Sequence, residues 1–222
     1  MVMLSARADA TRQTILQAAI RCFAARGFKA TTTRAVAAEA GVTSPLIHHY
    51  FGDKEQLFEA ATAKLVADYE RAQEAQWARE PDDVGFFTEG LRVLFDWTGS
   101  DLDRVRFMTW ARLEGRTGNS RAAAELTERV RGKFAAAQIH GVLRADLDID
   151  AAMMAIDAWV KGYWQQEAFH PALTDRENLR ERVFSLSLRI LLEGLLTPQA
   201  LTRARGAYPS LRCRIENGLS RE

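Results

Sequence analysis

The 222-residue sequence is poor in cysteine and proline, and it contains no long apolar run. Its two cysteines, Cys22 and Cys213, lie near opposite ends, which suits a reducing compartment better than a disulfide framework. No run reaches the roughly 18 to 20 apolar residues of a membrane helix, and the first twelve residues lack the apolar stretch of a secretory signal. We therefore expect a cytoplasmic protein with unbridged cysteines and no membrane partner.

Proline and glycine are also too scarce, at 5 and 14 residues, for a disordered or collagen-like chain, and 47% of the residues are hydrophobic. The net charge of +1 hides a segregation of charge. Residues 1–54 carry 7 basic and 3 acidic side chains, residues 55–198 carry 18 and 24, and residues 199–222 carry 5 and 2. A basic first segment favours a polyanionic partner, and a solvated basic surface is the alternative.

Apolar residues recur with helical spacing throughout, without period-two alternation or an internal repeat, so we predict an all-α fold of about nine helices. The expected helices cover residues 12–26, 32–41, 44–50, 53–77, 83–97, 102–116, 121–140, 151–169 and 175–196. Pro198 is expected to end the helical body, which leaves residues 199–222 as a flexible basic tail. The arginines of this tail are either solvated or add non-specific DNA contacts.

Glycine and capping residues divide the first sixty positions. Gly27 predicts a helix stop that folds Phe28 back on Phe23, and Asp53 with Gln56 predicts a capping box for the long fourth helix. Two short helices, joined by a turn at Gly41 and preceded by a longer helix, are typical of a helix-turn-helix DNA reader. Its predicted internal core consists of Val36, Ala37, Ala40, Val42 and Ile47.

This segment resembles the DNA-binding domain of the TetR family of transcriptional regulators. The residues that carry the resemblance are Gly27, Phe28, Thr31, Thr32, Arg34, Val36, Ala37, Ala40, Gly41, Val42, Ile47, His49, Tyr50, Phe51, Asp53, Lys54, Glu55 and Leu57. The resemblance covers about residues 10–60 and implies a helix-turn-helix domain at 1–53 and a helical ligand-sensing and dimerisation domain at 54–198. This chain departs from the family at His48, where Tyr is usual, and at Leu46, where a small residue is usual.

The second short helix is the expected recognition helix, because an α-helix fits the major groove of DNA. The side chains expected to contact DNA from it or its start are Thr43, Ser44, Pro45, Leu46, His48, His49 and Tyr50. Thr32 and Thr33, at a helix N-terminus, and Lys54 are expected to bind phosphates. Arg34 is expected to reach a phosphate or a guanine edge, and a solvated surface arginine is the alternative.

The aromatic-rich body has two expected roles under the resemblance. A pocket for an apolar or aromatic effector is predicted at Phe107, Trp110, Trp159 and Tyr163, with Glu114 and Gln166 as polar contacts. The alternative is that these rings only fill the core. A homodimer interface is predicted on the last two helices of the body, because a twofold pair of readers matches a palindromic operator. Its expected residues are Ala151, Ala155, Leu179, Val183, Leu186 and Ile190.

We therefore predict a dimeric, ligand-responsive regulator of double-stranded DNA, most simply a repressor, with an activator of the same family as the alternative. An enzyme is not expected, because the sequence contains no G-x-S-x-G, H-E-x-x-H, Walker-type or paired C-x-x-C motif. We expect no cofactor and no metal, since His48 and His49 are neighbours on one helix and point about 100° apart. A protein-interaction module with a vestigial DNA reader remains the alternative from another class.

Overall fold

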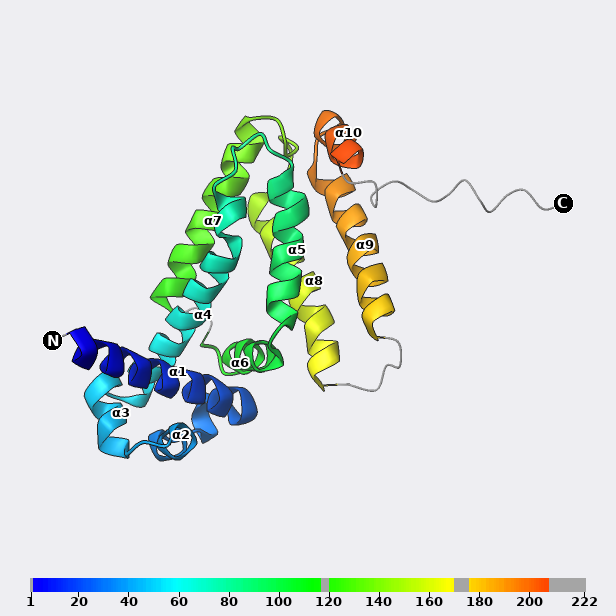
Figure 1. Cartoon of the computed structure of the whole chain (residues 1–222). Helices are drawn as coiled ribbons and strands as arrows, with labels where there is room; N and C mark the ends of the chain where they lie inside the picture. Colours follow the sequence, from blue (N-terminus) through cyan, green and yellow to red (C-terminus); the bar gives the residue numbers. More distant parts are fainter. Residues whose placement is uncertain (1, 117–119, 170–175, 208–222) are drawn as a thin grey trace. The chain divides into compact units, whose positions relative to one another are not determined.

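The computed structural model describes residues 2–116, 120–169 and 176–207, and the described chain is all-α, as predicted. Its ten helices follow one another along the sequence (Figure 1). They are α1 (Val2–Ala30), α2 (Thr33–Ala40), α3 (Ser44–Phe51), α4 (Lys54–Trp77), α5 (Gly85–Gly99), α6 (Leu102–Leu113), α7 (Arg121–Ile139), α8 (Ile149–Phe169), α9 (Arg176–Leu195) and α10 (Pro198–Ala207). Within these residues, no helix has the length and apolar character to cross a membrane.

The chain divides into two compact units, and several helices contribute residues to both. The first, here called the reader unit, comprises Met1–Arg71, Trp97–Glu128 and Lys161–Pro171. The second, here called the body unit, comprises Ala72–Asp96, Arg129–Val160 and Ala172–Glu222. The reader unit thus extends beyond the expected domain of residues 1–53, because α6 packs against α1 (Figure 1).

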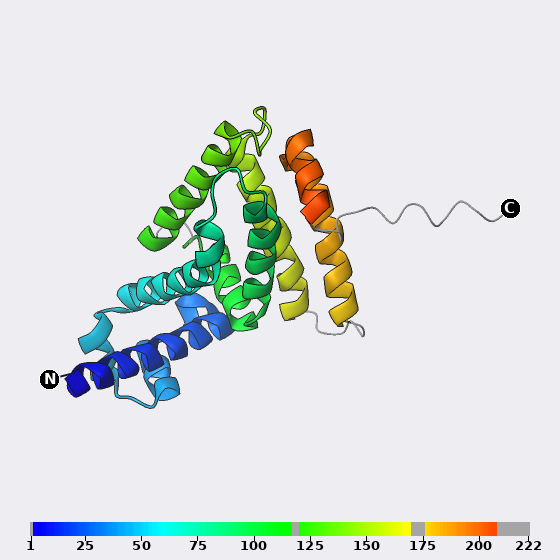
Figure 2. The same ribbon diagram turned by 45° about the horizontal axis from the view of Figure 1, so that its top comes forward.

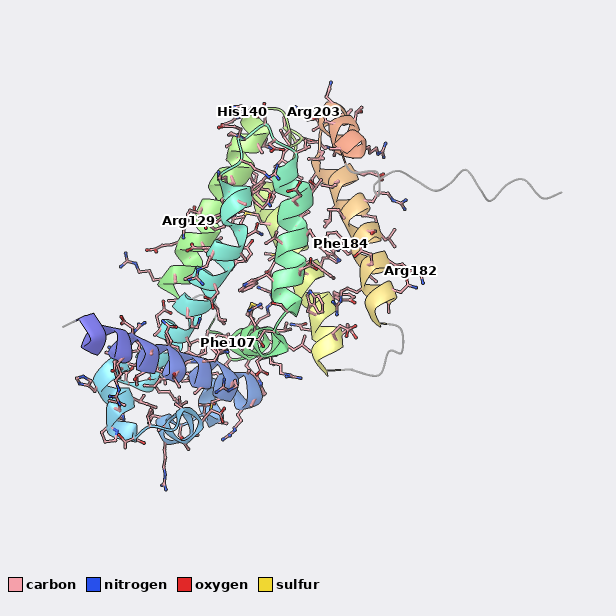
Figure 3. The ribbon with its side chains drawn as sticks, in the orientation of Figure 1. Phe107, Arg129, His140, Arg182, Phe184 and Arg203 are labelled. Atoms are coloured by element: carbon pink, nitrogen blue, oxygen red, sulfur yellow. The ribbon has the colours of Figure 1, made fainter. Side chains whose placement is uncertain are left out.

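The core of the reader unit joins α1, the helix-turn-helix, α4 and α6. Ile15, Leu16 and Phe23 of α1 are almost fully buried together with Ile47 of α3 and Leu57 of α4. Phe107 lies on α6 (Figure 3) and brings this helix into the same core, because its ring stacks on Phe58 at 4.9 Å between centroids. This aromatic contact makes α6 part of the support of the DNA reader.

Gly27 interrupts α1, as the sequence predicts. Its φ of 75° lies in the region that favours glycine, and the rings of Phe23 and Phe28 stack across it at 5.9 Å. A Cβ at this position would lie 2.9 Å from both Trp110 and Glu114 of the α6 end. Glycine is therefore required here by the backbone conformation and by the close approach of α6.

Cys22, on the buried face of α1, is a free cysteine, and Cys213 lies outside the described residues. Burial, followed by the charge of Glu39, raises the pKa of the Cys22 thiol. The side chain is therefore a small apolar part of the core and poor in reactive thiolate.

The core of the body unit is built around aromatic side chains. Phe184 of α9 (Figure 3) packs with Phe95 of α5 and Trp159 of α8, and the three ring centroids are 5.2 to 5.9 Å apart. Phe87 of α5 and Phe134 of α7 form an edge-to-face pair at 5.2 Å. These contacts tie α5 to α7, α8 and α9.

The prediction that Pro198 ends the helical body is wrong, because residues 198–207 form α10. Thr197 caps this helix by accepting from the Ala200 N–H at 3.3 Å, and Pro198 occupies its first turn. Ala200 and Ala204 are fully buried, and α10 lies beside α9 (Figure 2), where Arg205 pairs with Glu193 at 2.8 Å. The remaining tail residues, 208–222, lie outside the described chain.

Candidate nucleic-acid interface

The start of α2 offers both hydroxyl groups and unpaired backbone N–H groups to an anion. Thr32 has an extended backbone and its Oγ1 accepts from the Ala35 N–H at 3.1 Å, which leaves the other N–H groups of the first turn without a helical partner. Thr33 is half-buried and Arg34 is exposed. Because the positive end of the helix dipole lies here, the Thr32 to Arg34 segment suits a phosphate.

The turn between α2 and α3 fixes the angle of the two helices. Gly41 ends α2 in the left-handed conformation, and the Val42 N–H returns to the Ala37 carbonyl at 2.9 Å. Val36, Ala37 and Ile47 are buried, and Ala40 and Val42 pack against the same core, which confirms the five residues predicted to lock the motif.

The outer face of α3 carries most of the residues predicted to contact DNA. Thr43, Pro45, His48 and His49 are exposed, and Ser44 and Leu46 are half-buried. Tyr50 differs, because its ring packs against the reader core and contacts the His49 ring at 5.5 Å. The Tyr50 side chain thus helps to hold α3 against the core of the reader unit.

Lys54 is engaged within the protein. Its amine donates to the carbonyls of Phe28 and Thr31, both at 3.1 Å, and lies 4.3 Å above the Phe28 ring. The phosphate contact expected from the sequence stays a prediction, and the observed geometry ties the start of α4 to the end of α1. Lys54 is therefore a positioning residue for the reader.

The end of α6 supplies further contacts that the sequence did not reveal. The Glu114 carboxylate accepts from the backbone N–H groups of Phe28 and Lys29, at 2.8 and 3.1 Å. Arg116 places its guanidinium 3.1 Å from the centre of the Phe28 ring. Buried Thr31 donates to the Gly27 carbonyl at 2.7 Å. Together these contacts fix the junction between α1 and α2.

The residues predicted to line an effector pocket fall into different environments. Phe107 is buried in the reader core, Glu114 binds the α1 backbone, and Trp110 lies against Gly27. Tyr163 and exposed Gln166 also belong to the reader unit, whereas Trp159 belongs to the body unit. Phe107 thus has the core role that the sequence analysis gave as the alternative, whereas Glu114 has a structural role that the sequence did not indicate.

The predicted dimer residues lie on two helix faces of the body unit. Ala151 and Ala155 of α8 are exposed, and Leu186 and Ile190 of α9 are 51% and 61% exposed. Leu179 and Val183 are half-buried, and Met154, beside Ala155, is 73% exposed. Large exposed apolar side chains at helical spacing form an uncovered apolar surface on each helix.

A helix-turn-helix with an exposed second helix and an anion-binding helix start, carried by an all-helical body, defines a DNA-binding regulator. Residues 15–61 match the family described as "Bacterial regulatory proteins, tetR family". The chain is 29% identical over 157 residues to the transcriptional repressor AcnR of Corynebacterium efficiens. The aligned segment covers 69% of this chain and 79% of that protein.

Two further similarities extend the comparison. The chain is 30% identical over 129 residues to the transcriptional repressor SCO4008 of Streptomyces coelicolor, covering 58% of this chain and 63% of that protein. A gamma-butyrolactone receptor, described as an ArpA-like protein, has the same fold with a TM-score of 0.63 and 20% identity, covering 92% of this chain and 98% of that chain. Other curated relatives match over only 48 residues, about a quarter of their own length.

Residues 15–61 of the chain form a DNA-binding domain of the kind found in the TetR family of bacterial transcriptional regulators. The chain binds DNA through its helix-turn-helix. Both statements agree with the sequence-based predictions of family and of function class.

Proposed function

We propose that this protein is a homodimeric, ligand-responsive repressor that binds a palindromic operator through α3. The observation that carries the proposal is the exposed outer face of α3, next in the chain to a helix α2 whose capped start suits a phosphate. The two curated relatives described above are both named as repressors, which favours repression over activation. Because its target is DNA, the protein is expected to work in the cytoplasm.

The DNA contacts divide into two groups by chemistry. Thr32, Thr33 and Arg34 bind phosphates and set the register, because hydroxyl, N–H and guanidinium donors suit phosphate oxygens. The start of α3 reads base edges, since the N-terminal residues of a recognition helix enter the groove most deeply. The residues assigned to base or groove contacts are Thr43, Ser44, Pro45 and Leu46, with His49 and Tyr50 toward the backbone.

The dimer forms through α8 and α9. The exposed side chains of Met154, Leu186 and Ile190 would leave apolar area in water in a monomer, and the alanines at 151 and 155 allow close approach of a second helix. A twofold axis through this surface closes a four-helix interface and gives the two α3 helices the symmetry of a palindrome.

The effector is a small apolar or aromatic molecule bound near Trp159 or Tyr163. The aromatic cluster of Trp159 with Phe95 and Phe184 supports an apolar site, and a protein of the same fold is named as a receptor for a small lactone. An effector that binds the operator-incompetent form more tightly must lower the affinity for DNA by the same factor. Release of the operator is the resulting output.

Selection of bound duplexes from a random pool tests this proposal with the full-length protein. Enrichment of a sequence with two inverted half-sites is the expected result. Absence of any enrichment at low ionic strength would instead favour a protein-interaction module with a vestigial reader, and enrichment of single half-sites would remove the dimer from the proposal.

A further inference from the structure

His48 is held by a short contact at the end of the recognition helix. Its Nδ1 lies 2.7 Å from the carbonyl oxygen of Gly52, and the Gly52 N–H returns to the His48 carbonyl at 2.9 Å. A carbonyl oxygen only accepts hydrogen bonds, so Nδ1 must carry the hydrogen. The tautomer of the neutral ring is thereby fixed, and Nε2 is the nitrogen left for an outside partner.

In the neutral ring, Nε2 carries a lone pair and can only accept a hydrogen bond. The oxygens of a DNA phosphate are also acceptors, so neutral His48 cannot form a hydrogen bond with them. Uptake of one proton from solvent at Nε2 makes this nitrogen a donor and gives the ring a positive charge. The protonated ring then forms a charge-assisted hydrogen bond with a phosphate.

We propose that His48 is a proton-dependent phosphate contact, so that DNA binding through α3 is coupled to uptake of one proton at Nε2. This inference rests on the proposed use of α3 as the recognition helix. A phosphate is favoured over a base edge because His48 is exposed in the last turn of α3, whereas base edges are read mainly from the first turns.

Charged groups on the flanking elements are largely engaged elsewhere. On α2, Glu39 pairs with Arg21 of α1 at 2.8 Å, and Arg34 is exposed at the opposite end of the helix. On α1, Arg12 lies over the Phe51 ring. On α3 itself, His49 is the neighbouring titratable group, and its ring contacts Tyr50.

The start of α4 completes this set of charges. The Asp53 carboxylate accepts from the Gln56 N–H at 2.8 Å, Lys54 binds the α1 carbonyls, and Glu55 lies 3.8 Å from Arg116. No carboxylate of the described residues forms an ion pair with His48, so an incoming phosphate would be the anion that stabilises the protonated ring.

The test compares the affinity of the full-length protein for one duplex, enriched from a random pool, at pH 6 and pH 8. We expect the affinity to rise about tenfold as the pH falls, within the limit of tenfold per pH unit for one proton. The slope of log affinity against log salt should also be about one unit steeper at pH 6. Calorimetry in two buffers of different ionisation enthalpy should report uptake of about half a proton on average over this pH range.

The His48→Gln variant should bind with no such pH dependence, and His48→Arg should bind at pH 8 about as tightly as the native protein binds at pH 6. The matched control is His140→Gln, which should keep the pH dependence, because His140 is also exposed and its Nδ1 also lies against a carbonyl, that of Ala136 at 2.8 Å, but it follows α7 and not α3. Circular dichroism establishes that each variant is folded.

Equal pH dependence in the native protein and His48→Gln would overturn the inference and leave the proposed function standing. A gain of affinity with rising pH would also overturn it, since a neutral Nε2 would then be accepting from a base amino group. Failure of the native protein to bind DNA at either pH and low salt would instead overturn the proposed function.

Discussion

The carboxylate of Glu114 accepts a hydrogen bond from the backbone N–H of Phe28 at 2.8 Å, across 86 positions of sequence. A second bond, from the Lys29 N–H at 3.1 Å, completes a cap at the point where Gly27 breaks α1. Backbone N–H groups bound to a carboxylate form stronger hydrogen bonds than those bound to a neutral acceptor. The end of α6 therefore sets the position from which α2 begins.

Replacing Glu114 by Gln should weaken this cap, because the charge is lost and one accepting carboxylate oxygen is replaced by an amide NH2 group, which can only donate. We expect a loss of about 1 to 2 kcal/mol in the free energy of unfolding, measured by urea denaturation. Affinity for the operator should also fall, as the start of α2 loses its fixed position.

The matched control for this change is Glu125→Gln on α7, whose carboxylate pairs with highly exposed Arg121. We expect the control to change stability by less than about 0.5 kcal/mol. Equal stability of the two variants would mean that the Glu114 bonds contribute nothing measurable to the fold.

Substitution by alanine is expected to change the stability of the protein in opposite directions at Gly27 and Gly132. Alanine at position 27 must adopt a φ of 75° and lies 2.9 Å from Trp110, so we expect a loss of about 2 to 4 kcal/mol. Alanine at position 132, inside α7 with open space around it, should stabilise the protein by about 0.5 to 1 kcal/mol. Thermal unfolding of both variants measures the two stability changes. A Gly27→Ala variant as stable as the native protein would contradict the prediction.

Local sequence signals predicted the helix-turn-helix well. The Gly27 stop, the turn at Gly41 and the reciprocal Asp53–Gln56 capping box are all present, because each depends on residues close together in the chain. The family resemblance, on which the identification of the DNA reader rests, is carried by the same short segment. The all-α fold followed from helical periodicity.

Other features depend on contacts between residues that are distant in sequence. The sequence around Glu114 and around Lys54 contains no local pattern that indicates their backbone partners. The capping roles of these two residues are therefore visible only in the structure. The start of α1 at Val2 lies ten residues earlier than expected, because the added residues precede Ile15, the first buried residue among the described side chains of the helix, and show no helical pattern of core positions. For α10, Thr197 followed by Pro198 was a usable signal of a helix start, but it was interpreted as a helix end.

Thr32 and Thr43 precede neighbouring helices but should respond differently to alanine. The Thr32 hydroxyl caps α2, so Thr32→Ala should lower stability by about 1 kcal/mol. Thr43 makes no side-chain capping bond to α3, so Thr43→Ala should change stability by less than about 0.5 kcal/mol. Both should weaken DNA binding, and full operator affinity in Thr43→Ala would remove this residue from the proposed contacts.

The proposed dimer surface can be tested by adding charge to it. Aspartate in place of Ile190, which is 61% exposed on α9, would bury a charge in the interface and should yield a monomer in sedimentation velocity at micromolar concentration. Ile139 at the end of α7 is 83% exposed, and Ile139→Asp should remain a dimer. A native protein that sediments as a monomer would contradict the proposal directly.

The central claim, that the outer face of α3 contacts DNA, is tested most directly by two matched proline substitutions. Pro45 and Pro198 are both exposed in the first turn of a helix, where glutamate is compatible with the helix and favourable to its dipole. The affinity of each variant for the selected duplex is measured by fluorescence anisotropy over a salt series. Pro45→Glu should lose most of the operator affinity while Pro198→Glu retains it, and equal affinities of the two variants would contradict the claim.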